Sequence, residues 1–231
     1  LTQRELAKKI GLSKKFIQKS EGGLTSTKTI NIKRWLDGLN LKFNYINKYV
    51  EYIKSHDKKI PIKFPIRESP LHIQILAHGI FDGSKEKDQC IRYKVRYDKG
   101  TKELFKNLLV KCFGVKSYGH TDNCYFLYKS LSQLLSKHYR ISEFNSKKAF
   151  LSKKMLNLSK NPEFRRAILR AAFLDEGHCK HNTTSKNHEK LRLSLVCSIK
   201  NKKLAKQLRY LTNLENYKTS LYSSVKNTQF T

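Results

Sequence analysis

The chain has 231 residues, and its 48 Lys plus Arg against 18 Asp plus Glu give a formal charge of +30. Such an excess opposes compaction by self-repulsion and favours a polyanionic partner, with nucleic acid first. No apolar stretch approaches the length of a membrane-spanning helix, so we expect no membrane partner. Five cysteines without a CxxC pair argue against a disulfide framework or zinc ribbon and favour a reducing, cytoplasmic compartment, associated with a nucleoid or its organellar equivalent.

Residues 1–44 predict a helix-turn-helix. Thr2 can cap a helix over Gln3–Ile10, Gly11 supplies the turn, and Ser13 can cap a second helix that ends at Ser20. A third amphipathic helix is expected to carry one apolar face: Ile32, Trp35, Leu36 and Leu39. The segment resembles the lambda-repressor/Cro-like family without its usual first helix, so we expect the chain to begin inside a domain. The resemblance implies that four side chains of the second helix meet DNA: Lys14, Lys15, Gln18 and Lys19. The alternative is a three-helix packing unit with incidental lysines.

Residues 45–69 lose this regularity. Pro61 and Pro65 interrupt the stretch, which therefore cannot form one helix. It predicts a linker or a short covering strand, with a domain boundary near residue 60.

A short pattern then occurs twice, as Ile75–Gly83 and Leu169–Gly177. In each copy an apolar helical run with small residues ends in an acid followed by Gly, first Asp82-Gly83 and later Glu176-Gly177. We predict that Asn161 and Pro162 open the second of these helices. A repeated pattern of this kind indicates an internal duplication.

The segments that follow the two copies come in the same order: a polar loop, a strand, an amphipathic helix and a hairpin. The strands are expected at Cys90–Tyr97 and Leu191–Ser198, the helices at Thr101–Phe113 and Lys202–Leu211. The first hairpin is expected to pair Val115–Tyr118 with Cys124–Tyr128 and to precede a helix over Ser130–Tyr139. The second pairs Tyr217–Ser223 with Val225–Phe230, and no equivalent of the last helix follows, which suggests a trimmed end.

Both acids occupy the last turn of a helix, where the macrodipole disfavours a carboxylate by roughly 0.3–1 kcal/mol. Packing the two helices side by side would add repulsion between the carboxylates, about 3 kcal/mol at 5 Å and a dielectric of 20. A divalent cation between them would turn both penalties into ligation, and oxygen ligands suit Mg²⁺. A local rule broken twice at equivalent places indicates function.

From residue 70 onward, the two copies with their following strand, helix and hairpin resemble the LAGLIDADG homing endonucleases in single-chain, two-repeat form. The resemblance implies an α+β fold of two pseudo-symmetric αββαββα-type repeats, residues 70–145 and 146–231, whose antiparallel sheets form a saddle over double-stranded DNA. It implies that Asp82 and Glu176 are catalytic and, with Gly83 and Gly177, bind Mg²⁺ or Mn²⁺. An alternative register that uses Gly79 would put Ser84 at the acidic position. Asp175 is expected to be a surface neighbour.

In the first strand Arg92, Lys94 and Arg96 alternate with Tyr93, Val95 and Tyr97, which predicts one cationic face. The expected DNA contacts of the saddle are Arg92, Lys94, Arg96 and Arg192. The expected function is site-specific, metal-dependent cleavage of both DNA strands by a monomer. The alternatives are a DNA-binding regulator that keeps the fold without cleavage, and an RNA-binding maturase role. Self-splicing is not expected, because splice-junction residues are missing.

Overall fold

A computed structural model of the chain describes residues 1–21, 29–41, 52–55, 58–61, 66–85, 91–94, 99–116, 118–121, 124–145, 147–183, 191–223 and 228–230. The chain divides into two compact units, Leu1–Arg67 and Glu68–Thr231, called the head and the body below. None of the helices in the described part of the chain is long and apolar enough to span a membrane.

The head contains three helices, α1 (Gln3–Ile10), α2 (Lys14–Glu21) and α3 (Thr29–Gly38). The Thr2 hydroxyl accepts from the Glu5 amide, and the Glu5 carboxylate accepts from the Thr2 amide in return, so α1 begins at a complete capping box. Gly11 ends α1 at φ 67°, a left-handed conformation that costs glycine little. The Ser13 hydroxyl accepts from the Phe16 amide at the start of α2, as predicted.

A small core joins these helices: Leu6, Ala7, Ile10 and Ile17, with Leu12 and Trp35 packed against it. The prediction that Leu39 shares the buried face of the third helix is wrong, because α3 ends at Gly38 and Leu39 is 41% exposed. Further along the head, β1 (Tyr52–Ser55) and β2 (Lys58–Pro61) form an antiparallel hairpin.

The body is a mixture of helices and small antiparallel sheets. Its helices are α5 (Pro70–Asp82), α6 (Lys99–Phe113), α7 (Lys129–Tyr139), α8 (Lys153–Leu158), α9 (Pro162–Glu176) and α10 (Lys202–Leu214). Its strands are β3 (Gly83–Lys85), β4 (Ile91–Lys94), β5 (Tyr118–Thr121), β6 (Cys124–Leu127), β7 (Gly177–Thr183), β8 (Leu191–Ile199), β9 (Leu221–Ser223) and β10 (Thr228–Phe230).

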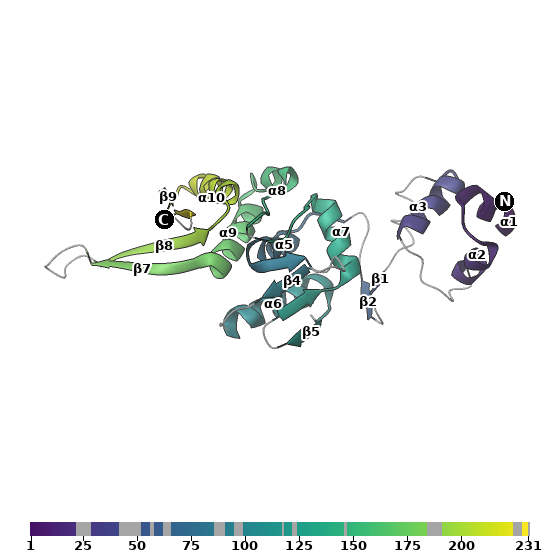
Figure 1. The fold of residues 1–231 in the computed structure, drawn as a ribbon, viewed down its shortest axis with the longest axis horizontal. Helices are drawn as coiled ribbons and strands as arrows, with labels where there is room; N and C mark the ends of the chain where they lie inside the picture. The colour runs from purple at the N-terminus through teal and green to yellow at the C-terminus, as the bar shows by residue number, and fades with distance from the viewer. Residues whose placement is uncertain are drawn as a thin grey trace. The chain divides into compact units, whose positions relative to one another are not determined.

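The two sheets of the body have the same connectivity. One has the strand order β3-β4-β6-β5 and the other β7-β8-β10-β9, so each runs first, second, fourth, third along the chain. Each sheet is preceded by one of the motif helices, α5 or α9, and each has a helix, α6 or α10, between its second and third strands. The order of elements is therefore repeated, and Figure 1 shows the β7–β8 hairpin extending from the end of α9 as β3 and β4 follow α5.

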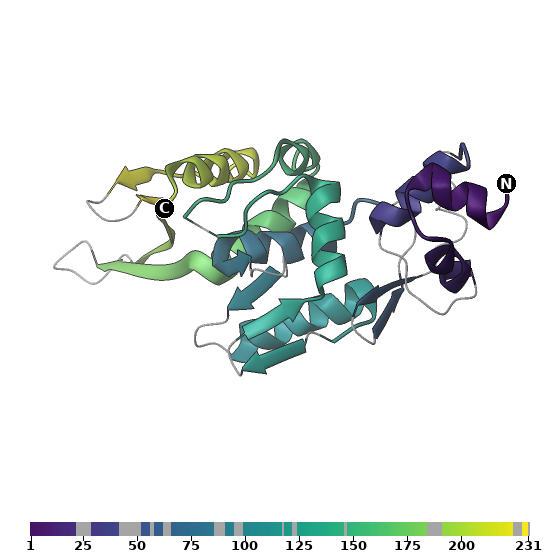
Figure 2. The ribbon, with the colours of Figure 1, turned by 45° about the vertical axis from the view of Figure 1, so that its right-hand side comes forward.

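Helices α5 and α9 begin alike and pack on each other. Ser69 caps α5 and Asn161 caps α9, and in each helix Pro occupies the first turn, where its missing N–H costs nothing. The contact between α5 and α9 is the most extensive between any two described helices, and both views place the pair side by side at the centre of the body (Figures 1 and 2). The run from Ile73 to Phe81 is buried throughout, so α5 is a core helix rather than an amphipathic one.

The structure differs from the sequence-based prediction at several elements. Strands β3 and β7 follow the acid–Gly pairs directly, where polar loops were expected, because polar side chains do not prevent a ladder from forming once a partner strand is in register. Between α7 and α9, where no helix was predicted, lies α8, whose start is capped by the Ser152 hydroxyl, which accepts from the Met155 amide. The first hairpin starts at Tyr118 rather than Val115, because Val115 is buried beyond the end of α6.

Gly79 shows how closely α5 is packed within its own repeat. A Cβ at this position would lie 2.9 Å from Ile91 Cγ2 and 2.9 Å from Phe144 Cδ1, both in buried side chains. The small residue of the first motif therefore makes room for a strand and a loop of the same repeat.

We predict that Gly79→Ala lowers the free energy of unfolding by about 1–2 kcal/mol, because overpacking outweighs the helical preference of Ala over Gly. Urea denaturation of the two proteins measures the difference. Equal or greater stability of the variant would contradict the packing described for Gly79.

Candidate active site at the ends of the two motif helices

The two predicted acids stand at equivalent places in the fold. Asp82 is the last residue of α5 and Glu176 the last residue of α9, and both are partly exposed. Neither helix has a basic residue in its last turn, so the macrodipole of each helix disfavours the negative charge there. Both acids are thus partly exposed residues at the negative end of a helix.

Glycine is required after each acid because the chain turns sharply from helix into strand. A Cβ at Gly83 would overlap the carbonyl oxygen of Gly79, and a Cβ at Gly177 would overlap the carbonyl oxygen of Phe173. The Gly177 amide donates to that same Phe173 oxygen and closes the end of α9. The glycine is thus a steric requirement of this helix-to-strand junction in both repeats, whereas sterics do not explain the acid before it.

A third carboxylate, that of Asp175, is buried between the repeats. Its side chain is 0% exposed, and the Nδ1 of His78 on α5 lies 2.9 Å from each of its two oxygens. The Tyr93 hydroxyl of β4 donates to Asp175 Oδ1 at 2.5 Å. His78, Tyr93 and Asp175, called the buried cluster below, therefore connect α9 of the second repeat to α5 and β4 of the first.

The expectation that Asp175 is a surface neighbour is wrong. Burial raises the pKa of Asp175 above its ordinary value, and the hydrogen bonds from His78 and Tyr93 oppose that rise. The rings of the cluster pack on each other and on Phe105: the Tyr93 ring centroid lies 5.1 Å from that of His78 and 4.4 Å from that of Phe105. The buried carboxylate of Asp175 is thus met by two donors that both belong to packed aromatic side chains.

The buried cluster lies next to both acids along the backbone. Asp175 immediately precedes Glu176, His78 is one helical turn before Asp82, and Tyr93 pairs with Gly83 across the β3–β4 ladder. In the second sheet the strand residue that pairs with Gly177 is Cys197. Its thiol lies 3.9 Å from the carbonyl oxygen of Ala172.

The donor set at the helix ends suits a hard cation but does not form a cage. Among the residues that the structure describes, no group of three or more His, Cys, Asp or Glu side chains lies close enough to hold a metal ion. Two carboxylates are nevertheless the usual protein share of a Mg²⁺ site that is completed by water and substrate phosphate. Asp82 and Glu176 fit that share, with the carbonyl oxygens of Gly83 and Gly177 beside them.

The expected DNA contacts fall into two groups. In the head, Lys14, Lys15, Gln18 and Lys19 are all exposed on α2. In the body, Arg92 is partly buried on β4, and Tyr93 beside it points inward, as the predicted alternation requires. Lys94 and Arg192 lie in β4 and β8 with side chains outside the described part of the structure, and Arg96 lies outside the described residues altogether.

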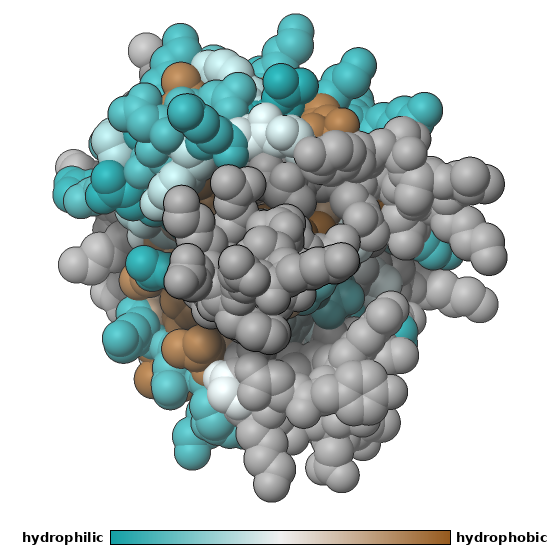
Figure 3. Space-filling view, turned by 90° about the vertical axis from the view of Figure 1, so that its left-hand side faces the viewer, coloured by the Kyte–Doolittle hydropathy of each residue, from teal (hydrophilic) through white to brown (hydrophobic). Residues whose placement is uncertain are grey.

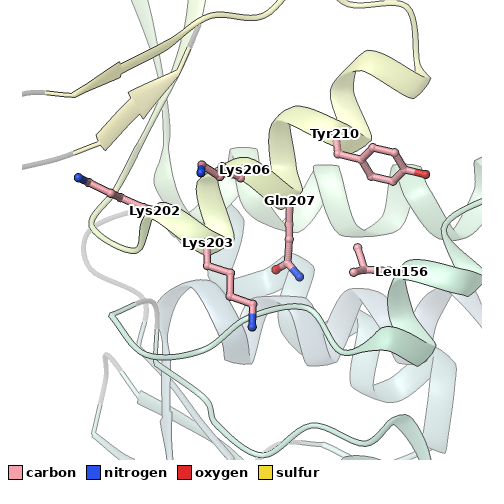
Figure 4. Close-up of a pocket in the computed structure, with 6 residues that line it drawn as sticks. All are labelled: Leu156, Lys202, Lys203, Lys206, Gln207 and Tyr210. Atoms are coloured by element: carbon pink, nitrogen blue, oxygen red, sulfur yellow. The ribbon is translucent and has the colours of Figure 1, made fainter.

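A shallow groove between α8 and α10 belongs to neither acid (Figure 4). It is lined by Leu156, Lys202, Lys203, Lys206, Gln207 and Tyr210. The Gln207 amide is engaged with the Leu151 backbone, from which it accepts at 2.8 Å and to which it donates at 3.0 Å. Three lysines line this groove: Lys202, Lys203 and Lys206. On the face of the molecule shown in Figure 3, most of the coloured residues are hydrophilic.

Sequence reasoning missed the buried cluster, although two signals pointed to it. His78 is a polar residue inside an otherwise apolar helical run, and a buried polar side chain requires a partner. Asp175 immediately precedes Glu176 in the second repeat. It becomes the partner of His78 once α5 and α9 are packed together. Pairing two residues so far apart in sequence needed the tertiary contact between the helices.

Comparison with models of known protein families gave no match, and comparison with curated proteins gave none.

The cysteine thiols differ in burial, and their reactivity therefore reports on how tightly the segments around Asp82 and Glu176 are packed. Burial raises the pKa of Cys197 to about 12, with the charges of Glu176 and Asp175 adding to the rise, and burial raises the pKa of Cys112 to about 12. Cys179 on β7 is exposed. Because the thiolate is the reactive form, we expect the buried Cys197 and the partly buried Cys112 to react slowly at pH 8.

We therefore predict that iodoacetamide at pH 8 modifies Cys179 at least about tenfold faster than Cys197 or Cys112 in the native protein. In urea the three should react at similar rates. Peptide mass spectrometry after timed exposure measures this, and rapid native labelling of Cys197 would contradict its burial under α9.

Proposed function

We propose that the chain is a metal-dependent, site-specific endonuclease that cuts both strands of duplex DNA as a monomer, in the manner of LAGLIDADG homing endonucleases. The observation that carries the proposal is the repetition of one unit: a helix of the α5–α9 pair that ends in an acid, then a sterically required glycine, then a sheet of the same strand order. Two such units in one chain supply one acid for each strand of a duplex.

In this proposal Asp82 and Glu176 hold the metal, with the backbone of Gly83 and Gly177 beside them. A bound Mg²⁺ or Mn²⁺ supplies activation of water and stabilisation of the leaving oxygen. The chain itself contributes position, because each acid ends a helix that is capped ahead of its first-turn proline and packs one buried stretch into the body, Ile73–Phe81 in α5 and Ala167–Ala172 apart from Arg170 in α9. Both acids are partly exposed at the surface of the body, as contact with a phosphodiester requires.

The head favours a second candidate function, a DNA-binding regulator without cleavage. Its α1–α2 turn, with the capping box and the left-handed Gly11, has the features of a helix-turn-helix, and four polar or cationic side chains are exposed along α2. The two candidates agree on duplex DNA as the partner. They differ only in whether the acids act.

We predict that affinity for duplex DNA falls steeply with salt, with a log–log slope of magnitude at least about 5, because many cations displace counterions from phosphates. Substitution of Lys14, Lys15 and Lys19 by Gln should reduce the slope by about 1 for each phosphate that the variant no longer neutralises. Fluorescence anisotropy over a salt series measures both quantities.

The matched control is the pair of exposed lysines on α1, Lys8 and Lys9, replaced by Gln in the same head. Equal effects of the α1 and α2 substitutions would contradict α2 as the recognition helix. A slope near zero for the unmodified protein would overturn the nucleic-acid proposal as a whole.

The acids decide between enzyme and regulator. We predict that Asp82→Asn and Glu176→Gln each reduce double-strand cutting by at least about 100-fold. DNA affinity should be retained, and stability should stay equal or rise by up to about 1 kcal/mol, because a carboxylate leaves the negative end of a helix. Cutting of plasmids that carry the DNA flanking the gene, in Mg²⁺ and Mn²⁺, measures the activity.

Glu163→Gln is the control, since Glu163 is exposed in the first turn of α9, where the same dipole favours a negative charge. It should leave cutting unchanged and lower stability slightly. Retained double-strand cutting in both Asp82→Asn and Glu176→Gln would falsify the assignment of the acids. A wild-type protein that binds DNA without cutting would favour the regulator.

A further inference from the structure

The buried cluster costs more than an apolar contact would. Asp175 is fully buried, and the Nε2 of the 1%-exposed His78 finds no hydrogen-bond partner among the described residues. Burying an ion and a polar group in this way is unfavourable unless the geometry of the remaining contacts is good. The cluster therefore needs a role beyond filling space.

The other repeat shows that apolar residues can fill the equivalent positions. Counted from the glycine after each acid, Ala172 corresponds to His78, Phe81 corresponds to Asp175, and Cys197 takes the ladder position of Tyr93. Phe81, Ala172 and Cys197 are all buried. The polar version occurs on one side alone, where hydrogen bonds of defined length and direction join the two repeats.

We propose that His78, Tyr93 and Asp175 act as positioning residues that fix the register of α9 against α5 and β4, and so fix Glu176 relative to Asp82. Each member of the cluster is close along the backbone or the ladder to one of the two acids. Asp175 precedes Glu176, His78 is one helical turn before Asp82, and Tyr93 lies opposite the glycine that follows Asp82. A slide of α9 along α5 would break the bonds to Asp175 and leave its carboxylate buried without donors. That the spacing of Asp82 and Glu176 matters for metal binding rests on the proposed function. That the cluster fixes the register of α9 against α5 does not.

The test uses the full chain and two variants. Asp175→Asn removes the charge and replaces one acceptor oxygen by an NH₂ donor, so His78 keeps its hydrogen bond only by changing tautomer and accepting at Nδ1. Tyr93→Phe removes a single hydroxyl and keeps the ring, which makes it the milder change if Asp175→Asn fails to fold. Backbone hydrogen exchange at residues 79–84 and 173–178 reports on the two helix ends, and titration with Mn²⁺ alone reports on the acids.

The control is Glu215→Gln, which weakens a buried ion pair at the opposite end of α9. There Glu215 Oε1 lies 2.6 Å from Arg165 Nη2, and each side chain is 9% exposed. This variant should speed exchange near the start of α9 and leave residues 79–84 and Mn²⁺ affinity unchanged. It separates general loosening of α9 from loss of register.

We expect Asp175→Asn and Tyr93→Phe each to speed exchange at both helix ends by at least about tenfold, and to weaken Mn²⁺ binding by a similar factor. The effect of Tyr93→Phe on residues 173–178 is decisive, because that variant lies in the other repeat. Exchange that rises in one helix only, or no more than in Glu215→Gln, would overturn the proposal, as would unchanged Mn²⁺ affinity. A wild-type chain that binds no Mn²⁺ would overturn the proposed function instead, and exchange alone would then decide the register.

Discussion

The centre of the body depends on one carboxylate that has no access to water. Burial disfavours the ionised form of Asp175 unless donors meet its two oxygens. These donors come from the other repeat, His78 on α5 and Tyr93 on β4. The contact between α5 and α9 is thus constrained twice, by apolar packing along the helices and by hydrogen bonds near their ends. Apolar packing alone tolerates small shifts between helices, whereas hydrogen bonds between buried groups do not.

The two repeats share their order of elements but contribute different residues to the contact between them. Both place an acid at the end of a helix of the α5–α9 pair and a glycine at the start of the strand that follows. The glycine recurs because the same steric problem arises at each helix-to-strand junction. Around that common frame one side of the interface is polar and the other is built from Phe81, Ala172 and Cys197. A chain with unlike halves can read an imperfect palindrome, which agrees with the proposed monomeric endonuclease.

Few acids are present to pair with the many basic residues of the chain. Several of its few acids are engaged with cations or helix ends: Glu68 with Lys154 at 2.8 Å, Glu215 with Arg165 and Arg166, and Glu5 in the capping box of α1. These pairings lower the pKa of Glu215 through its hydrogen bond with Arg166 first, and that of Glu68 through Lys154 first. Most of the 48 Lys and Arg have no acid to meet, since the chain has only 18. The excess is available to phosphates, as the proposed DNA partner requires.

The sequence by itself determined the local features. Thr2, Ser13 and Asn161-Pro162 predicted where helices begin, and the acid–Gly pairs predicted where the motif helices end, because caps, turns and helix ends depend on residues within one or two turns. The proposed acids, Asp82 and Glu176, came from that local pattern and its repetition. The tertiary structure decided what lies between the repeats: strands in place of loops after each glycine, the hydrogen bonds from His78 and Tyr93 to Asp175, and a buried Asp175 in place of an exposed one. Those outcomes depend on which distant segment supplies the hydrogen-bond partner, and no periodicity within one segment contains that information.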